Sequence, residues 1–298
     1  MLLPALLAVA ALLPSCDNSF TPKSDYKERI VVFCVLEPSA PYQMVRLETT
    51  YDAATTNPDD ALPKRRIDSA IVRINTDRRS YLFTDTLIDV GGGELRRVWI
   101  SRAFVPAAGA SYTMTVQVPG MSTISAAVQV PGRPYLDLDT PNPSAGRLGV
   151  TLRAGAISAQ APPKGFYFRL YVEGEAVVNG KTVKLRREVP LRVDNANNDT
   201  TWSSPIRSSS LSFSVDHIAD VKTRLENVDG ARNMQIIGFG YSLDTFIYSY
   251  FQTVRGFDDP VSVRQDRPDV TNIVGGVGIF GAIVRDTLSK PYVTVITN

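Results

Sequence analysis

The chain has 298 residues, and its 32 lysines and arginines nearly balance its 30 aspartates and glutamates, so the formal charge is only +2. A nucleic-acid partner would call for a concentrated basic face, which this balance argues against. The length is enough for one large or two ordinary domains. Four basic doublets are scattered among the expected strands: Arg65-Arg66, Arg78-Arg79, Arg96-Arg97 and Arg186-Arg187. Such doublets are typical of solvent-exposed faces and of edge strands whose charges prevent aggregation, with a functional basic patch as the alternative.

The N-terminus has the pattern of an export signal. Leu2 to Leu13 is almost wholly apolar but shorter than the roughly 20 residues that span a bilayer. It runs into Leu13-Pro14-Ser15-Cys16, which resembles the lipobox of bacterial lipoproteins. A buried core helix is the alternative, and Pro4 fits it poorly. We therefore expect a signal peptide over residues 1–15, lipid on Cys16 and a polar tether over residues 16–28.

The second cysteine, Cys34, lies in the apolar run Ile30 to Leu36. If Cys16 carries lipid, no intramolecular disulfide is possible. Cys34 is then expected to be a small buried core residue, with a reactive nucleophile as the less favoured interpretation.

From Ile30 onward the hydrophobic period is two, which indicates strands with one buried face. We expect strands at 30–36, 45–48, 67–75, 80–86, 97–102, 111–118 and 123–130. Tyr112 stands early in one of these strands, where a tyrosine of immunoglobulin-like (Ig-like) sandwiches bonds back to the upstream backbone. These features predict an Ig-like β-sandwich over residues 29–131, ending at Pro131-Gly132.

Residues 132–298 are expected to form a second β-rich domain with two short helices, so the fold class is mainly β. A long ribbon turns at Asn179-Gly180, a strong hairpin signal. Asp216 is a candidate cap for a helix over Ile218 to Glu226. In the second helix, capped by Ser242 or Asp244, an apolar stripe at helical spacing is expected to pack against a sheet: Ile247, Tyr250, Phe251 and Val254.

Motifs for cofactor or metal chemistry are weak. Gly276, Gly278 and Gly281 form a literal G-x-G-x-x-G, but too few residues follow for a dinucleotide fold, so we expect a strand there. His217 is the only histidine, which rules out a multi-histidine metal site and favours a capping or surface role. Asp194 to Asp199 departs from the calcium-loop pattern and is more typical of a hairpin. No cofactor, metal or catalytic residue is predicted.

Two further sets of residues could bind or cleave a glycan. Trp202, and with it Trp99, is a candidate platform for stacking on a sugar, although a buried loop anchor is an equal interpretation for Trp202. Paired carboxylates could hydrolyse glycosides if they flanked a cleft. The candidates cluster in one polar stretch: Asp258, Asp259, Asp266 and Asp269.

The stretch Asp269 to Ala282 contains Asn272-Ile273 and then a glycine-rich run that ends Gly278-Ile279-Phe280-Gly281. It resembles the closing signature of the Bacteroidota-type lipoproteins known as domain of unknown function 4249. The aromatic helix Phe246 to Phe251 and the opening Val31 to Leu36, followed by Gln43 to Leu47, match as well. The similarity covers about residues 28–285.

The resemblance implies an outer-membrane lipoprotein, often thought to work alongside TonB-dependent transporters, and it supplies no catalytic residues. The leading hypothesis is therefore a non-catalytic accessory or binding subunit, anchored to the outer membrane through Cys16, with a TonB-dependent transporter as partner. A surface glycan-binding module that uses Trp202 is the second hypothesis, and a hydrolase that uses the loop carboxylates is the third.

Overall fold

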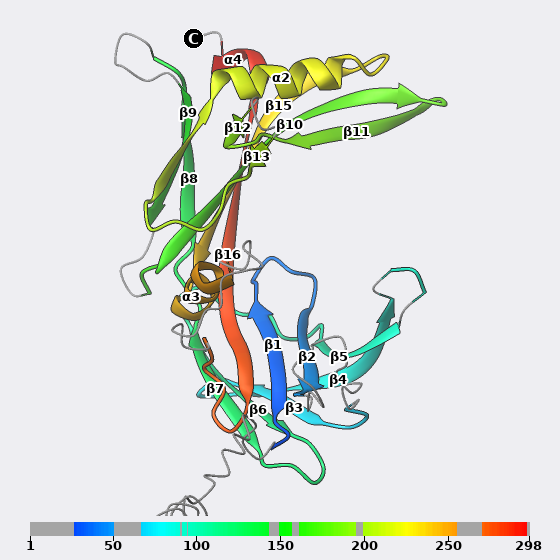
Figure 1. Cartoon of the computed structure of the whole chain (residues 1–298), viewed down its shortest axis with the longest axis vertical. Helices are drawn as coiled ribbons and strands as arrows, with labels where there is room; N and C mark the ends of the chain where they lie inside the picture. Colours follow the sequence, from blue (N-terminus) through cyan, green and yellow to red (C-terminus); the bar gives the residue numbers. More distant parts are fainter. Residues whose placement is uncertain are drawn as a thin grey trace, which may run out of the picture. The chain divides into compact units, whose positions relative to one another are not determined.

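The computed structural model describes residues 27–50, 67–89, 91–93, 95–142, 149–156, 161–194, 199–254 and 270–296. Within these residues the chain is mainly β, as the period-two pattern predicts (Figure 1). The strands are β1 (Ile30–Leu36), β2 (Gln43–Thr49), β3 (Ile71–Asn75), β4 (Ser80–Asp89), β5 (Leu95–Ser101), β6 (Ser111–Gln117), β7 (Ile124–Gln129), β8 (Pro134–Asp139), β9 (Gly149–Ala156), β10 (Gly165–Val178), β11 (Lys181–Glu188), β12 (Arg192–Asp194), β13 (Asp199–Thr201), β14 (Ser210–Ser214), β15 (Arg232–Leu243) and β16 (Val277–Pro291). The helices are α2 (Val215–Glu226), α3 (Thr245–Val254) and α4 (Tyr292–Ile296).

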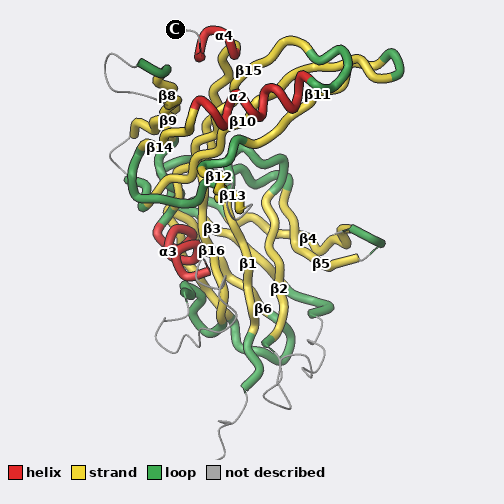
Figure 2. The backbone as a smooth tube through the Cα atoms, turned by 45° about the horizontal axis from the view of Figure 1, so that its top comes forward, coloured by secondary structure: helices red, strands yellow, loops and turns green. Residues whose placement is uncertain are grey.

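An 11-stranded sheet organises the chain, in the order β11-β10-β15-β16-β1-β2-β5-β4-β3-β6-β7. The other strands of the described residues form a three-stranded sheet, β14-β9-β8, and the small hairpin β12-β13. Every pairing between named strands is antiparallel except that of β1 with β16, which is parallel from Val31 opposite Val277 to Leu36 opposite Ala282. The last long strand therefore lies beside the first (Figures 1 and 2).

The N-terminal strands form the predicted Ig-like sandwich. β4 passes between its two layers, because its first half pairs with β3 and its second half pairs with β5. Inward-facing side chains of both layers build one core, in which Val32, Val45, Val72, Met114 and Val116 are completely buried. Alternation of buried and exposed residues along each strand is what places those side chains inside.

Tyr112 behaves as the sequence predicts for a sandwich of this kind. Its hydroxyl accepts a hydrogen bond of 2.8 Å from the backbone N–H of Ala107, five residues upstream. Its ring lies 5.2 Å from that of Phe104, edge to face, in the same core. The bond fixes the approach to β6 by joining the strand to the loop before it.

A second core lies between β8, β9, β14 and α2 on one side and β10 and β15 on the other. Phe168, Leu170 and Val172 of β10 are completely buried in it, together with Leu152 of β9 and Ile218 of α2. Figure 2 shows α2 lying along the ribbon of β10 and β11. This core packs against one face of the strands β10 and β15, and α3 packs on the opposite face of the large sheet.

β16 belongs to both halves of the chain. Its residues Phe280, Ala282 and Val284 lie in the sandwich core, whereas Leu288 packs against the second core. Arg29–Thr50 and Lys64–Asn298 form one compact unit. The domain boundary between residues 131 and 132 stays a prediction. A boundary at that point assigns β16 to the second domain, although β16 also contributes to the core of the N-terminal sandwich.

Two helix details differ from the sequence-based expectation. The N-cap of α2 is Ser214, whose hydroxyl accepts from the Asp216 N–H at 3.2 Å, so the helix begins before Asp216 and that residue lies in its first turn. In α3, Ile247 and Tyr248 are the buried pair, whereas Tyr250 and Phe251 are 36% and 38% exposed. The prediction that the whole aromatic stripe packs against a sheet is therefore wrong for those two rings.

Candidate functional site

An apolar surface lies on the outer side of β1 and β2. Both strands turn alternate residues into the sandwich core, and the residues between them face outward. In most half-buried strands such positions are polar. Here they include Phe33, Val35 and Met44, exposed by 38%, 43% and 36%. The pairing of Phe33 with Arg46 and of β1 with β16 joins them into one continuous face.

α3 packs on this face next to β1, and a glycine permits its close approach. A Cβ atom at Gly281 of β16 would lie 2.4 Å from Cγ1 of Ile247, so a larger residue would displace the helix or its side chain. Ile247 and Tyr248 then form a small core with Leu243 and Ile279. Glycine in a strand often marks such an approach.

Between α3 and the strands lies a groove of about 900 Å³. The volume is at the upper end of the range of small-molecule and peptide-side-chain pockets. We call it the α3 groove, and its apolar lining residues are Phe33, Val35, Ala40, Pro41, Tyr42, Met44, Ile247, Tyr250, Phe251 and Ile283. Contiguous exposed apolar surface of this kind marks binding sites on soluble domains.

The charged residues of the α3 groove lie in pairs at its rim. The guanidinium of Arg46 bonds to the carboxylate of Glu48 and also lies 5.7 Å from the centre of the Phe33 ring. Arg285 of β16 lies 3.6 Å from Glu37. Because these ions are already paired and partly exposed, they contribute little to stability and leave the floor of the groove apolar.

Asp244 fixes the start of α3. Its Oδ1 accepts from the Ile247 N–H at 2.7 Å, which confirms it as the cap in preference to Ser242. Burial raises the pKa of Asp244 to about 6, although backbone N–H donors of Ile247, Ala282 and Phe246 oppose that rise. The backbone N–H of Asp244 donates to the Ala282 carbonyl oxygen at 3.1 Å, so the capping residue also links the start of the helix to β16.

Arginines and aromatic rings interleave on the neighbouring strands β10, β15 and β16, on the same outer face. Tyr167 stacks on Tyr241 at 5.6 Å between centroids, and Tyr171 meets Phe239 edge to face at 5.5 Å. Arg169 lies 5.1 Å from the centre of Tyr171 and bonds to Glu188 of β11. Hydroxyl burial raises the pKa of Tyr171 to about 12. Tyrosine and arginine are the residue types enriched at the centres of protein interfaces.

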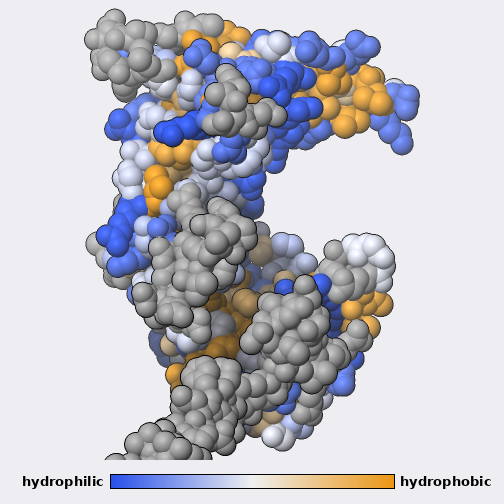
Figure 3. Space-filling model, viewed as in Figure 1, coloured by the Kyte–Doolittle hydropathy of each residue, from blue (hydrophilic) through white to orange (hydrophobic). Residues whose placement is uncertain are grey.

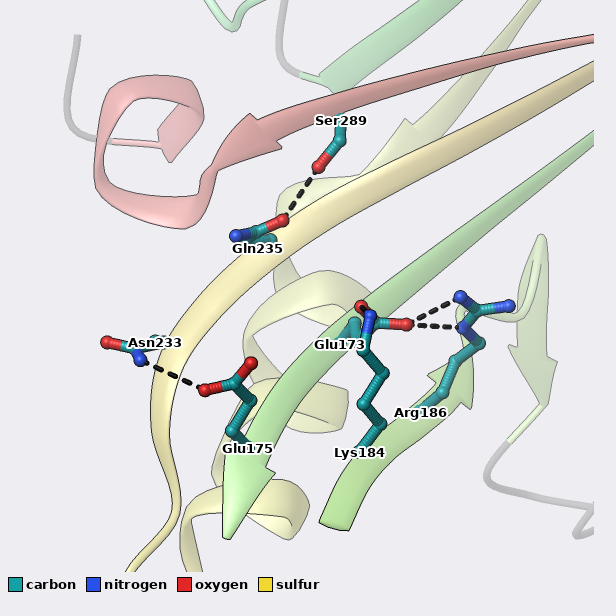
Figure 4. A network of polar contacts seen from close by, with 7 residues as sticks. All are labelled: Glu173, Glu175, Lys184, Arg186, Asn233, Gln235 and Ser289. Carbon is teal, nitrogen blue, oxygen red and sulfur yellow. Dashed lines mark hydrogen bonds and ion pairs between the residues drawn. The ribbon is translucent and has the colours of Figure 1, made fainter. Parts of the chain in front are cut away.

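Further along the ribbon, Glu173 of β10 bonds to two cations of β11 (Figure 4). Glu173 accepts from Arg186 at 2.5 Å and from Lys184 at 3.3 Å. Despite the cost of burial, these two cations hold the pKa of Glu173 below its usual value. They join β11 to β10 by side chains as well as by backbone bonds.

Some residues singled out in the sequence can be placed. Cys34 is buried in the sandwich core, as predicted, and burial raises the pKa of its thiol. Trp202 is 49% exposed, so it is a surface ring rather than a buried anchor. The prediction of an exposed Trp99 is wrong: that ring is 1% exposed, and its N–H donates to the Ala70 carbonyl at 3.2 Å. His217 lies in the first turn of α2, half-buried.

Gly278 and Gly281 of the glycine motif lie in β16, as expected, Gly276 directly precedes the strand, and the motif opens no helix. Gly278 has φ +111°, and a Cβ there would lie 2.0 Å from the Val32 carbonyl oxygen, so the motif serves the close pairing with β1. Asn272 of the same signature bonds to both backbone groups of Phe280, donating to its oxygen at 2.7 Å and accepting from its nitrogen at 2.9 Å. The signature is structural here.

Other predicted residues lie outside the described residues. These are Cys16 and the loop carboxylates Asp258, Asp259, Asp266 and Asp269. Asp194 and Asp199 pair across β12 and β13, which confirms a hairpin there. Among the described ranges no group of three or more histidine, cysteine, aspartate or glutamate residues could hold a metal ion. Within the same ranges no helix is long and apolar enough to cross a membrane.

Sequence reasoning missed the α3 groove. A signal for it was present, because β1 is apolar at every position, on both faces, and Met44 continues the outer one. A strand with two apolar faces needs a cover on each. The cover on the outer face is partial, since α3 leaves Phe33, Val35 and Met44 open at the groove.

Comparisons with known proteins give a family but no activity. The family model described as Domain of unknown function (DUF4249) matches residues 17–289, so the chain belongs to that family. No curated protein matches the sequence. Among solved structures, the chain is similar to domains A168–A170 of titin at 8% identity and a TM-score of 0.20, over 74% of this chain and 61% of the titin chain.

Proposed function

We propose that the chain is a non-catalytic binding subunit, held at the outer membrane by lipid on Cys16, that works with a TonB-dependent transporter. The observation that carries this proposal is the α3 groove, where exposed Phe33, Val35 and Met44 face the aromatic rings of α3. Such a lining suits the burial of apolar side chains of a partner. It offers little for acid–base chemistry, since the rim ions Arg46, Glu48 and Glu37 are paired.

The neighbouring arginine and aromatic side chains extend the same face toward β10. Large rings held in place by their neighbours lose little conformational freedom when a partner covers them. Arg169, Tyr171 and Phe239 are held in this way by stacking and by the bond to Glu188. We infer that the partner covers the groove and that this surface enlarges the interface.

The test is affinity purification of the tagged, detergent-solubilised protein, followed by mass spectrometry. We expect a TonB-dependent barrel in near-equal amount with the wild type. Met44→Glu places a charge on the floor of the groove and should lower the recovered barrel roughly tenfold or more. Leu82→Glu, at a β4 residue 57% exposed and outside the groove lining, is the matched control and should retain it. Recovery of the lipoprotein alone, or equal losses in both variants, would contradict the proposal.

A glycan-binding module is the second candidate, and the exposure of Trp202 favours it. An exposed indole can stack on a sugar ring. Affinity for an oligosaccharide on a glycan array, abolished by Trp202→Ala and unchanged by Met44→Glu, would replace the transporter proposal with this one.

A further inference from the structure

β11 is the terminal strand of the 11-stranded sheet. It pairs with β10 along one side, over eight residue pairs from Val178 opposite Lys181 to Tyr171 opposite Glu188. In the part of the chain that the structure describes, no strand pairs with its other side. An edge strand of this kind presents N–H and C=O groups that another extended chain can pair with.

The charge of this edge is basic on both faces of the strand. Lys184 and Arg186 point to the side of Glu173, and Lys181 and Arg187 alternate with them. All four are exposed, and the Lys184 side chain remains 70% exposed even in contact with Glu173. Glu188, at the end of the strand, is its single acidic residue and is already bonded to Arg169.

The edge is also held in a rigid form. Leu185 packs against the second core, and α2 lies against the ribbon (Figure 2). At the turn, Asn179 and Gly180 adopt φ +51° and +74°, as a two-residue hairpin turn requires. The end of the ribbon carries apolar atoms beside the basic ones (Figure 3), from Val177, Val178 and Val183, which are 48%, 46% and 41% exposed.

We propose that β11 is a docking edge for an extended acidic segment of a partner protein, which adds to the sheet as a further strand. Backbone hydrogen bonds would hold the segment, as in other cases of strand addition. Acidic side chains would meet a cation on either face, because cross-strand neighbours lie about 5 Å apart. A second copy of β11 is a poor occupant, since like charges would then stand opposite one another. The proposal is independent of the α3 groove.

The probe is a synthetic peptide as long as β11 in which pairs of glutamates alternate with pairs of valines, so that both faces of the added strand carry carboxylates. It is titrated by fluorescence anisotropy into the full, detergent-solubilised protein. We expect saturable binding that weakens with salt, and slower amide hydrogen exchange over Lys181–Glu188 in the bound protein. A peptide with lysine in place of glutamate should not bind. A peptide with the same charges but N-methylated backbone should bind roughly tenfold or more weakly, because it cannot form the ladder.

The variant Lys181→Glu with Arg187→Glu reverses two charges that are not paired with Glu173. It should weaken the acidic peptide roughly tenfold and allow the lysine peptide to bind. The double variant Arg78→Glu with Arg79→Glu, at another exposed basic doublet, is the matched control and should leave the affinity unchanged. Circular dichroism checks that both variants fold.

Three results would overturn the proposal. Equal binding of the N-methylated peptide would mean general electrostatic attraction rather than strand addition. Equal loss in the Arg78 and Arg79 variant would mean that the edge is not the site. A concentration-dependent dimer in which β11 is protected without peptide would mean that a second copy is the occupant.

Discussion

Gly281→Ala tests whether close packing on β16 holds α3 in place. The added Cβ would lie 2.4 Å from Cγ1 and 2.5 Å from Cδ1 of Ile247, far inside the usual carbon–carbon contact of about 3.5–4.0 Å. Ile247 is only 4% exposed and is stiff at its branched Cβ, so it cannot simply turn into solvent. Overpacking of this kind costs about 1–3 kcal/mol. Urea unfolding followed by circular dichroism should show a loss of that size.

A control and a double-mutant cycle make the test specific. Gly155→Ala, where the nearest atom to the new Cβ is 3.8 Å away, should change the free energy of unfolding by less than about 0.5 kcal/mol. Ile247→Ala should itself cost about 2–5 kcal/mol by leaving a cavity. In that background Gly281→Ala should cost much less than in the wild type, because the clashing atoms are gone. A Gly281→Ala protein as stable as the wild type would refute the reasoning, as would equal costs in both backgrounds.

Three further outcomes follow from single contacts. Tyr112→Phe removes the acceptor of the Ala107 N–H and should lower the free energy of unfolding by about 1 kcal/mol, seen as a lower Tm, whereas Tyr135→Phe, at a ring 61% exposed, should not. The pKa of Asp244 is about 6 in the folded chain and 3.8 in the unfolded chain, so the folded chain binds this proton more tightly. The stability that this group contributes is therefore full below pH 3.8 and is lost as the pH rises through 6. Urea midpoints measured against pH should show this decrease, and Asp244→Asn should abolish it. Burial raises the pKa of the Cys34 thiol, so peptide mapping after treatment with an alkylating reagent should find Cys34 modified only in the unfolded protein, and rapid labelling of the folded chain would contradict its burial.

Local patterns were sufficient for much of the fold. Alternation around Tyr112 and Met114 predicted β6, and the same tyrosine predicted its bond to the upstream backbone. Asn179-Gly180 predicted the turn of the long ribbon. Each of these signals depends on residues close together in the chain, so the sequence carries them directly.

Contacts between distant segments could not be read in that way. The parallel pairing of Val31–Leu36 with Val277–Ala282 joins the two ends of the chain, and periodicity says nothing about which strands are neighbours. The same pairing brings Phe280 into the sandwich core and sets α3 against β1. The wrong prediction for Trp99 has the same cause. Its sequence neighbours gave no sign that the segment containing Ala70 covers its ring. The candidate site depends on such distant contacts, and the sequence alone did not reveal it.

Site-specific photo-crosslinking tests the binding role of the α3 groove most directly. A photo-reactive phenylalanine analogue at Met44 would report on the groove, and the same analogue at Tyr135, an exposed position outside the groove lining, would serve as the control. After irradiation of intact cells, we predict a covalent adduct from Met44 whose partner mass spectrometry identifies as a TonB-dependent barrel. No adduct from Met44, or the same adducts from both positions, would contradict the account.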